Sequence, residues 1–128
     1  MADSVANAIT AMKLHVVPKI VVMQALGVGN SFPNLPWWMR YVRHWTYMRH
    51  SYDDHDLVNE EVKRASVKYV LPRPPWLTNG EMGPVRTFGD RGDGIGTFAM
   101  ISRKSVAGFL LDACERDDWD ESTPVIAR

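Results

Sequence analysis

The pattern of apolar and polar residues along the chain predicts both helices and strands. Val5, Ile9 and Met12 repeat at the spacing of one helical face. Residues 20–23 form an unbroken apolar run, which is typical of a strand buried on both faces. The same reasoning predicts helices at residues 3–15, 37–49, 53–65 and 103–115, and extended segments at residues 20–26, 67–71, 84–88, 97–101 and 124–127.

The order of these elements predicts an α/β fold. Strands that alternate with helices form parallel sheets, and their crossover connections are right-handed. The chain would pass from the strand at residues 20–26 through the helix at 53–65 to the strand at 67–71, so both strands would end at one edge of the sheet. Ligands bind at that edge in open α/β sheets. We therefore expect a mostly parallel sheet with flanking helices and a site at its carboxyl edge.

Composition narrows the class of protein. The 128 residues suffice for one domain, and 45% hydrophobic with 23% charged residues is an ordinary globular balance. The net charge of zero gives no electrostatic reason to expect nucleic acid or an anionic membrane as a partner. A single cysteine, Cys114, fits a reducing compartment, and the chain shows neither a secretory leader nor a membrane-length apolar run. We expect a soluble cytoplasmic protein.

The segment VKYVLPRPPWLTNG, residues 67–80, places a rigid corner at a strand end. Pro74 forces Arg73 out of helical geometry, and prolines 74 and 75 lack amide hydrogens, so the sheet ladder is expected to stop there. In one interpretation the corner is a stiff wall beside a cofactor or substrate, with Arg73 holding structure or an anion. In the other it is only a strand terminator with a salt-bridged arginine.

Two further groups of residues are candidates for chemistry. His55 lies among Asp53, Asp54 and Asp56 at a predicted helix start, where carboxylates would hold it protonated or oriented as a general acid, or would simply cap the helix. The aromatic residues Trp37, Trp38, Trp45 and Tyr47 would line a substrate pocket or form core. No metal site is expected, since His44, His50 and His55 lack the spacing of a helical metal pair.

Four ordered segments resemble a known family. They are IVVMQALGVG at residues 20–29, DLVNEEV at 56–62, the corner segment at 67–80 and ISRKSVAGFLL at 101–111, in which Ser105 stands where an aspartate is usual. Together they resemble the C-terminal half of atypical short-chain dehydrogenase/reductases of the NmrA-like, NAD(P)H-binding type. The blocks FPNL at residues 32–35 and YDDH at 52–55 are similar to the fungal averufin oxidase-type subgroup, which is linked to polyketide metabolism.

The resemblance implies a Rossmann-like fold, an NADP or NAD cofactor and an oxidoreductase acting on a small, polyketide-like molecule. It places one set of residues below the cofactor and another beside the nicotinamide. Its classical Tyr-x-x-x-Lys pair is not matched, because Tyr52 is followed by Asp56 at that spacing, which leaves His55 and Tyr52 as the candidate catalytic residues. The candidate cofactor-binding residues are Gln24, Ala25, Leu26 and Gly27 in the first set and Arg73, Pro74, Pro75 and Leu77 in the second; the candidate substrate-binding residues are Trp37, Trp38 and Trp45.

The family's glycine-rich first unit, which grips the dinucleotide pyrophosphate, matches nothing in residues 1–128. The glycine-rich run at residues 89–96 is predicted to be a turn, because it does not join a strand to a helix. Residues 1–128 would then be one partial dinucleotide-binding domain, with weak or no dinucleotide binding alone. The strand at 20–26 would be left as an apolar edge that invites a second copy of the chain.

Two other functions remain open on the sequence. One is a non-catalytic regulatory or dimerising module of the NmrA-like type. The other is a small ligand-binding or isomerase-like domain that uses the aromatic pocket of residues 37–47 with His55 and needs no nucleotide.

Overall fold

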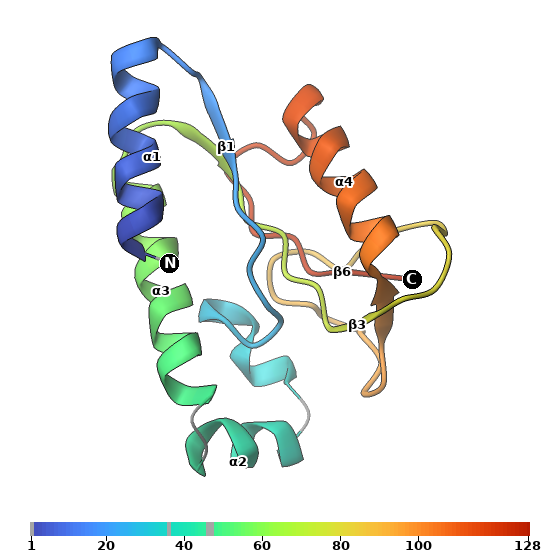
Figure 1. The fold of residues 1–128 in the computed structure, drawn as a ribbon. Helices are drawn as coiled ribbons and strands as arrows, with labels where there is room; N and C mark the ends of the chain where they lie inside the picture. Colours follow the sequence, from blue (N-terminus) through green and yellow to red (C-terminus); the bar gives the residue numbers. More distant parts are fainter. Residues whose placement is uncertain (1, 36, 46–47) are drawn as a thin grey trace.

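The structure is a computed structural model that describes residues 2–35, 37–45 and 48–128, without the side chains of residues 42–45 and 48–52. Its elements alternate between helices and short strands (Figure 1). In chain order they are α1 (Ala2–His15), β1 (Lys19–Val21), η1 (Gly29–Asn34), α2 (Trp37–Trp45), α3 (Met48–Arg64), β2 (Lys68–Val70), β3 (Trp76–Thr78), β4 (Arg86–Thr87), β5 (Met100–Ser102), α4 (Arg103–Glu115) and β6 (Ile126–Ala127).

The strands pair mostly in parallel. β1 pairs with β2, with Lys19 opposite Lys68, and β3 pairs with β5, whereas β4 and β6 are antiparallel. Parallel bridges at Val70 and Arg73 join the end of β2 to residues 122 and 125. The predicted α/β class with parallel strands and flanking helices is confirmed. The strand at residues 76–78 was not predicted, because two prolines directly precede it and the segment reads as a loop.

Backbone hydrogen bonds extend past the end of β2 as far as Pro74, so among the described residues the pairing ends at the proline corner, as predicted. The amide of Gln24 donates to the carbonyl of Pro72 at 2.8 Å, and that of Leu26 donates to the carbonyl of Pro74 at 3.0 Å. On the opposite side the amide of Arg73 donates to Pro124 at 2.8 Å. A proline loses its donor but keeps its acceptor, so pairing continues wherever the prolines are needed only as acceptors.

Helices cover the strands from two sides (Figure 1). α1 and α3 lie side by side, and their apolar residues Val5, Ile9, Val58 and Val62 pack with Leu71 in one buried cluster. α4 contributes to a second cluster on the other side, formed by the buried residues Val70, Ile101, Val106, Phe109, Ala113 and Ile126. Helical stripes on both sides explain why the strands read as continuous apolar runs.

The helix boundaries differ from the prediction in one place that affects function. α3 begins at Met48, so the Asp53–Asp56 block lies inside the helix rather than at its start. On α3 the side chains of Val58 and Val62 are fully buried, whereas that of Leu57 is 54% exposed. The helix-start explanation of the acids around His55 is therefore wrong.

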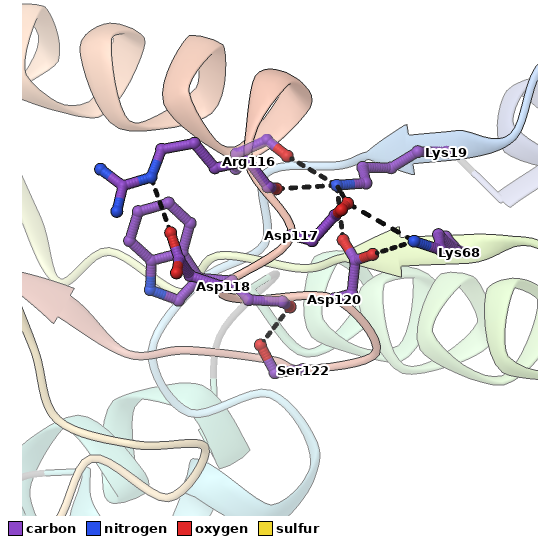
Figure 2. Close-up of polar contacts among 9 residues, drawn as sticks. Lys19, Lys68, Arg116, Asp117, Asp118, Asp120 and Ser122 are labelled. Carbon is purple, nitrogen blue, oxygen red and sulfur yellow. Dashed lines mark hydrogen bonds and ion pairs between the residues drawn. The ribbon is translucent and has the colours of Figure 1, made fainter.

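An ion-pair network joins α4 to the amino ends of β1 and β2 (Figure 2). Asp120 contacts Lys19 at 2.5 Å and Lys68 at 2.8 Å. The Lys19 ammonium also donates to the carbonyl of Arg116, just past the end of α4, at 2.7 Å, where a cation complements the helix dipole. The two lysines lower the pKa of Asp120 to about 2, chiefly through hydrogen bonds. The Asp120 side chain is accordingly only 15% exposed.

Candidate functional site

An apolar cavity of about 180 Å³ opens at the carboxyl ends of β1 and β2. It lies where the sheet topology predicts a ligand site. The residues that line it come from both strand ends, from the η1–α2 segment and from the loop before β5. They are Ala25, Leu26, Leu35, Met39, Pro74, Pro75, Trp76, Gly96, Thr97 and Ala99.

Four of the eight predicted cofactor-binding residues line this cavity: Ala25, Leu26, Pro74 and Pro75. The bond from the Leu26 amide to the Pro74 carbonyl ties the two strand ends together. Because proline fixes its own φ angle, the wall formed by residues 74 and 75 is stiff. The structure thus brings together the two segments that the sequence places near a cofactor.

Aromatic and sulfur-containing side chains form the outer wall. The rings of Trp38 and Trp76 are stacked, with centroids 6.1 Å apart and planes inclined by 16°. Trp76 and Met39 line the cavity, whereas Trp37 is 80% exposed and lies outside its lining. The side chain of Trp45, a predicted substrate-binding residue, lies outside the described residues. Pattern reasoning missed Trp76, although it directly follows the proline corner.

A loop before β5 closes another side of the cavity. The side-chain amide of Asn34 donates to the carbonyl of Arg91 at 2.9 Å and to the carboxylate of Asp93 at 2.8 Å, which fastens this loop to η1. The glycine-rich residues 89–96 form turns and lead to β5, not to a helix. They therefore shape the cavity and do not form a phosphate-binding helix start.

Arg73 does not line the cavity. It is fully buried, and its guanidinium donates to the side chain of Asn30 and, at 3.0 Å, to the backbone carbonyl of Asp90. Burial lowers the pKa of Arg73, against the opposing effect of Asp90 and Asp56. Arg73 thus holds the η1 segment to the loop at residues 89–96. Of its two predicted roles, holding structure or holding an anion, these contacts correspond to the first.

Gln24 and His55 form a pair on the face covered by α3. Nδ1 of His55 lies 2.7 Å from Oε1 of Gln24, which is 2% exposed. Burial lowers the pKa of His55 despite the opposing charges of Asp54 and Asp56, so the imidazole is neutral near pH 7. Burial thus opposes the protonated form that the carboxylates were expected to favour, and the side chain that contacts Nδ1 is Gln24. Neither residue lines the cavity.

The remaining predicted site residues have other surroundings. Gly27 is buried, has a φ of 95° and donates its amide to Ser31 at 3.0 Å, so it makes a tight turn that only glycine adopts easily. Leu77 packs in the α4 cluster and lies outside the cavity lining. The side chain of Tyr52 is outside the described residues. The sequence thus predicts the place of the cavity and four of its lining residues, while Gln24, Gly27, Arg73 and Leu77 lie outside the lining.

Comparisons with known proteins agree with this architecture. A family model described as NAD(P)H-binding matches residues 1–117. The chain therefore belongs to this NAD(P)H-binding family. No curated protein matches the chain significantly. The NmrA-like and averufin oxidase-type subgroups are not shown by the match.

Solved structures share the fold. The chain superposes with a TM-score of 0.74 on a protein from Bacillus halodurans described as an NAD-dependent epimerase/dehydratase, at 20% identity, covering 97% of this chain and 52% of that one. A short-chain dehydrogenase/reductase from Veillonella parvula, solved with NADP, superposes with a TM-score of 0.76 at 13% identity. The match covers 99% of this chain and 58% of that one. An anaerobillin reductase from Escherichia coli O157:H7 superposes with a TM-score of 0.76 at 14% identity. The match covers 96% of this chain and 56% of that one. The chain thus spans little more than half of these proteins.

Proposed function

We propose that the chain provides the nicotinamide-side and substrate-side walls of an NAD(P)H-dependent oxidoreductase. The observation that carries this proposal is the apolar cavity at the carboxyl ends of β1 and β2, lined by Ala25, Leu26, Pro74 and Pro75. An NAD(P)H-binding family match and a relative solved with NADP support it. A bound nicotinamide supplies hydride chemistry, while the protein supplies position and exclusion of water.

The residues present fit the nicotinamide half of the cofactor. A flat, weakly polar ring suits an apolar wall made stiff by two adjacent prolines. The same residues do not fit the pyrophosphate. Among the described residues, the glycine-rich run at 89–96 leads into β5, so it presents no helix amino terminus to phosphate oxygens. We propose that residues 1–128 alone bind the nicotinamide end weakly and the adenine end not at all.

A titration with cofactor halves tests the proposal. Reduced nicotinamide mononucleotide is expected to shift the amide resonances of Ala25 and Leu26 in ¹H–¹⁵N spectra, whereas adenosine 2′,5′-bisphosphate is expected to leave them unchanged. Ala25→Leu fills the cavity and should abolish the nicotinamide response. Ala107→Leu, on the exposed face of α4, is the matched control. An unchanged response in Ala25→Leu would exclude this cavity as the nicotinamide site.

For the substrate we propose a small, apolar and aromatic molecule of polyketide-like type. The stacked Trp38 and Trp76 beside the cavity support this, because tryptophan faces bind flat rings. His55 and Tyr52 remain the proposed proton donors. Since His55 is neutral and paired with Gln24 outside the cavity, it reaches a substrate only if the ligand extends toward α3.

The surroundings of the chain follow from smaller observations. Cys114 is exposed and unpaired, which supports a reducing, cytoplasmic location as part of the proposal. Within the described residues no helix combines the length and apolarity that a membrane crossing needs. A regulatory role without catalysis is not favoured by any feature of the described residues.

A further inference from the structure

The described residues that line the cavity are chemically uniform. None of the ten carries a charge, and eight offer only apolar side-chain atoms or no side chain beyond hydrogen. The two polar groups are the hydroxyl of Thr97 and the indole N–H of Trp76. A charged ligand group would lose its hydration there without gaining an ionic partner, which is costly.

The backbone holds Thr97 in a fixed place. The amide of Ala99 donates to the carbonyl of Gly96 at 3.0 Å, which closes a turn with Thr97 and Phe98 at its tip. Phe98 is 74% exposed, and Thr97, which is also exposed, contributes to the rim of the cavity. β5 begins one residue after the turn, with Met100 opposite Trp76. The turn therefore carries Thr97 to the side of the cavity that Trp76 also lines.

The hydroxyl of Thr97 is available to a ligand. Within the part of the chain that the structure describes, no protein group forms a hydrogen bond with it. In an apolar pocket, a few polar groups set the orientation of the ligand. A hydroxyl that donates to a ligand oxygen contributes a net ~0.5–1.5 kcal/mol, equivalent to about a two- to tenfold change in affinity.

We infer that Thr97 is the specificity-determining residue of this cavity, and that the cavity selects an uncharged, flat group bearing one oxygen acceptor. Such a group is an aryl ketone or a quinone-like ring carbonyl. Its ring would lie against Trp76 and the prolines, and its oxygen would accept from Thr97. This inference rests on the proposed function, since it names the class of substrate that the same site takes.

The test uses three probes of similar size without any dinucleotide: acetophenone, ethylbenzene and benzoate. Binding is followed by ¹H–¹⁵N spectra, through the indole N–H of Trp76 and the amides of Ala25 and Ala99. We expect acetophenone to bind most tightly, ethylbenzene more weakly and benzoate not at all. Thr97→Val, which keeps the shape, should weaken acetophenone binding about threefold or more and leave ethylbenzene unchanged. Thr97→Ser should retain acetophenone binding.

Thr10→Val is the matched control, since the Thr10 hydroxyl lies exposed on α1 and donates to the Ala6 carbonyl. It should change neither affinity. Equal acetophenone affinity in wild type and Thr97→Val would overturn the role of Thr97. Benzoate binding as tight as acetophenone would overturn the selection against charge. Because no probe contains nicotinamide, these failures are distinct from a failed titration with reduced nicotinamide mononucleotide.

Discussion

Arg73 is a full cation at a position with no exposed surface. Its donors satisfy the side chain of Asn30 and the carbonyl of Asp90, which belong to two loops that frame the cavity. Gly29 is part of the same arrangement, because a Cβ there would lie 3.0 Å from Nη2 of Arg73 and its φ of 54° disfavours other residues. Arg73 therefore stabilises the cavity without touching a ligand.

Replacing Arg73 tests that role. Arg73→Met removes the two charge-assisted hydrogen bonds that a buried guanidinium makes to Asn30 and Asp90, so we expect the free energy of unfolding to fall by about 2 kcal/mol. The measurement is urea unfolding followed by tryptophan fluorescence. Arg64→Met is the control, since Arg64 is exposed and pairs with Glu60 on the same helix, and it should stay within about 0.5 kcal/mol of wild type. Equal stability of both variants would contradict the buried role.

His55 is expected to make the folded protein less stable at acidic pH, whereas a histidine held in the protonated form would make it more stable there. Its pKa is lowered by burial, so the unfolded state binds the proton more readily than the folded state. The stability due to neutral His55 is present above its usual pKa of 6.5 and is lost as the pH falls through the lower folded value. We expect urea midpoints to drop as the pH falls below about 6.5, and to drop less in His55→Gln.

The control for this pH series is His15→Gln, at the exposed end of α1. This variant should show the same change of urea midpoint with pH as the wild type. A wild-type slope in His55→Gln as well would show that His55 does not titrate differently in the folded and unfolded states.

Single residues were predicted unevenly from the sequence. Spacing alone left prolines 74 and 75 as either a ligand wall or a strand terminator, and the family resemblance placed them beside a cofactor; both residues line the cavity. The partners of Arg73 and Gln24 come from segments 17 and 31 residues away, and no local pattern encodes such contacts. Their burial could therefore be seen only in three dimensions.

At the scale of elements, the network of Asp120 with Lys19 and Lys68 fixes α4 to the amino ends of the first two strands (Figure 2). The ligand cavity lies at the opposite, carboxyl ends of those strands. The ion pairs that join the elements therefore lie at the amino ends of β1 and β2, and the apolar ligand cavity lies at their carboxyl ends.

Acid titration tests this network. The folded pKa of Asp120 is about 2, below its usual 3.8, so its stabilising effect is complete above about pH 4 and is lost as the pH falls toward 2. Asp120→Asn should lower the urea midpoint at pH 7 and flatten its decline below about pH 4. Asp118→Asn, which changes a half-exposed carboxylate paired only with Arg116, should retain the wild-type decline. A wild-type decline in Asp120→Asn would contradict the assignment.

Elements with a strong local signal were predicted well. The helix predicted at residues 103–115 is α4, and the hydroxyl of Ser102 caps its start by accepting from the Ser105 amide at 3.0 Å. β3 was missed because its existence depends on β5, 24 residues away in the register that pairs Trp76 with Met100. Strand pairing of this kind is tertiary, so a three-residue strand after two prolines carries no local signal.

At the scale of the whole molecule, the edge of β1 that faces away from β2 is available for pairing with another strand. Within the described residues β1 pairs with β2 alone. Since the amides of Val22 and Gln24 face β2, the alternation of a strand directs those of Val21 and Met23 outward. Val16, Val17 and Met23 beside this edge are 87%, 44% and 41% exposed. An unpaired strand edge next to apolar side chains favours pairing with another strand.

We propose that residues 1–128 self-associate through this edge, with β1 of a second copy as the partner. Met23→Lys places a charge on the edge and should shift the chain from dimer toward monomer in size-exclusion chromatography with light scattering, because edge lysines disfavour strand addition. Leu111→Lys, which alters an apolar residue 67% exposed on α4, is the matched control and should leave the mass unchanged. A monomeric wild type with a cooperative melt would contradict self-association. A dimer that persists in Met23→Lys and dissociates in Leu111→Lys would instead place the interface on α4.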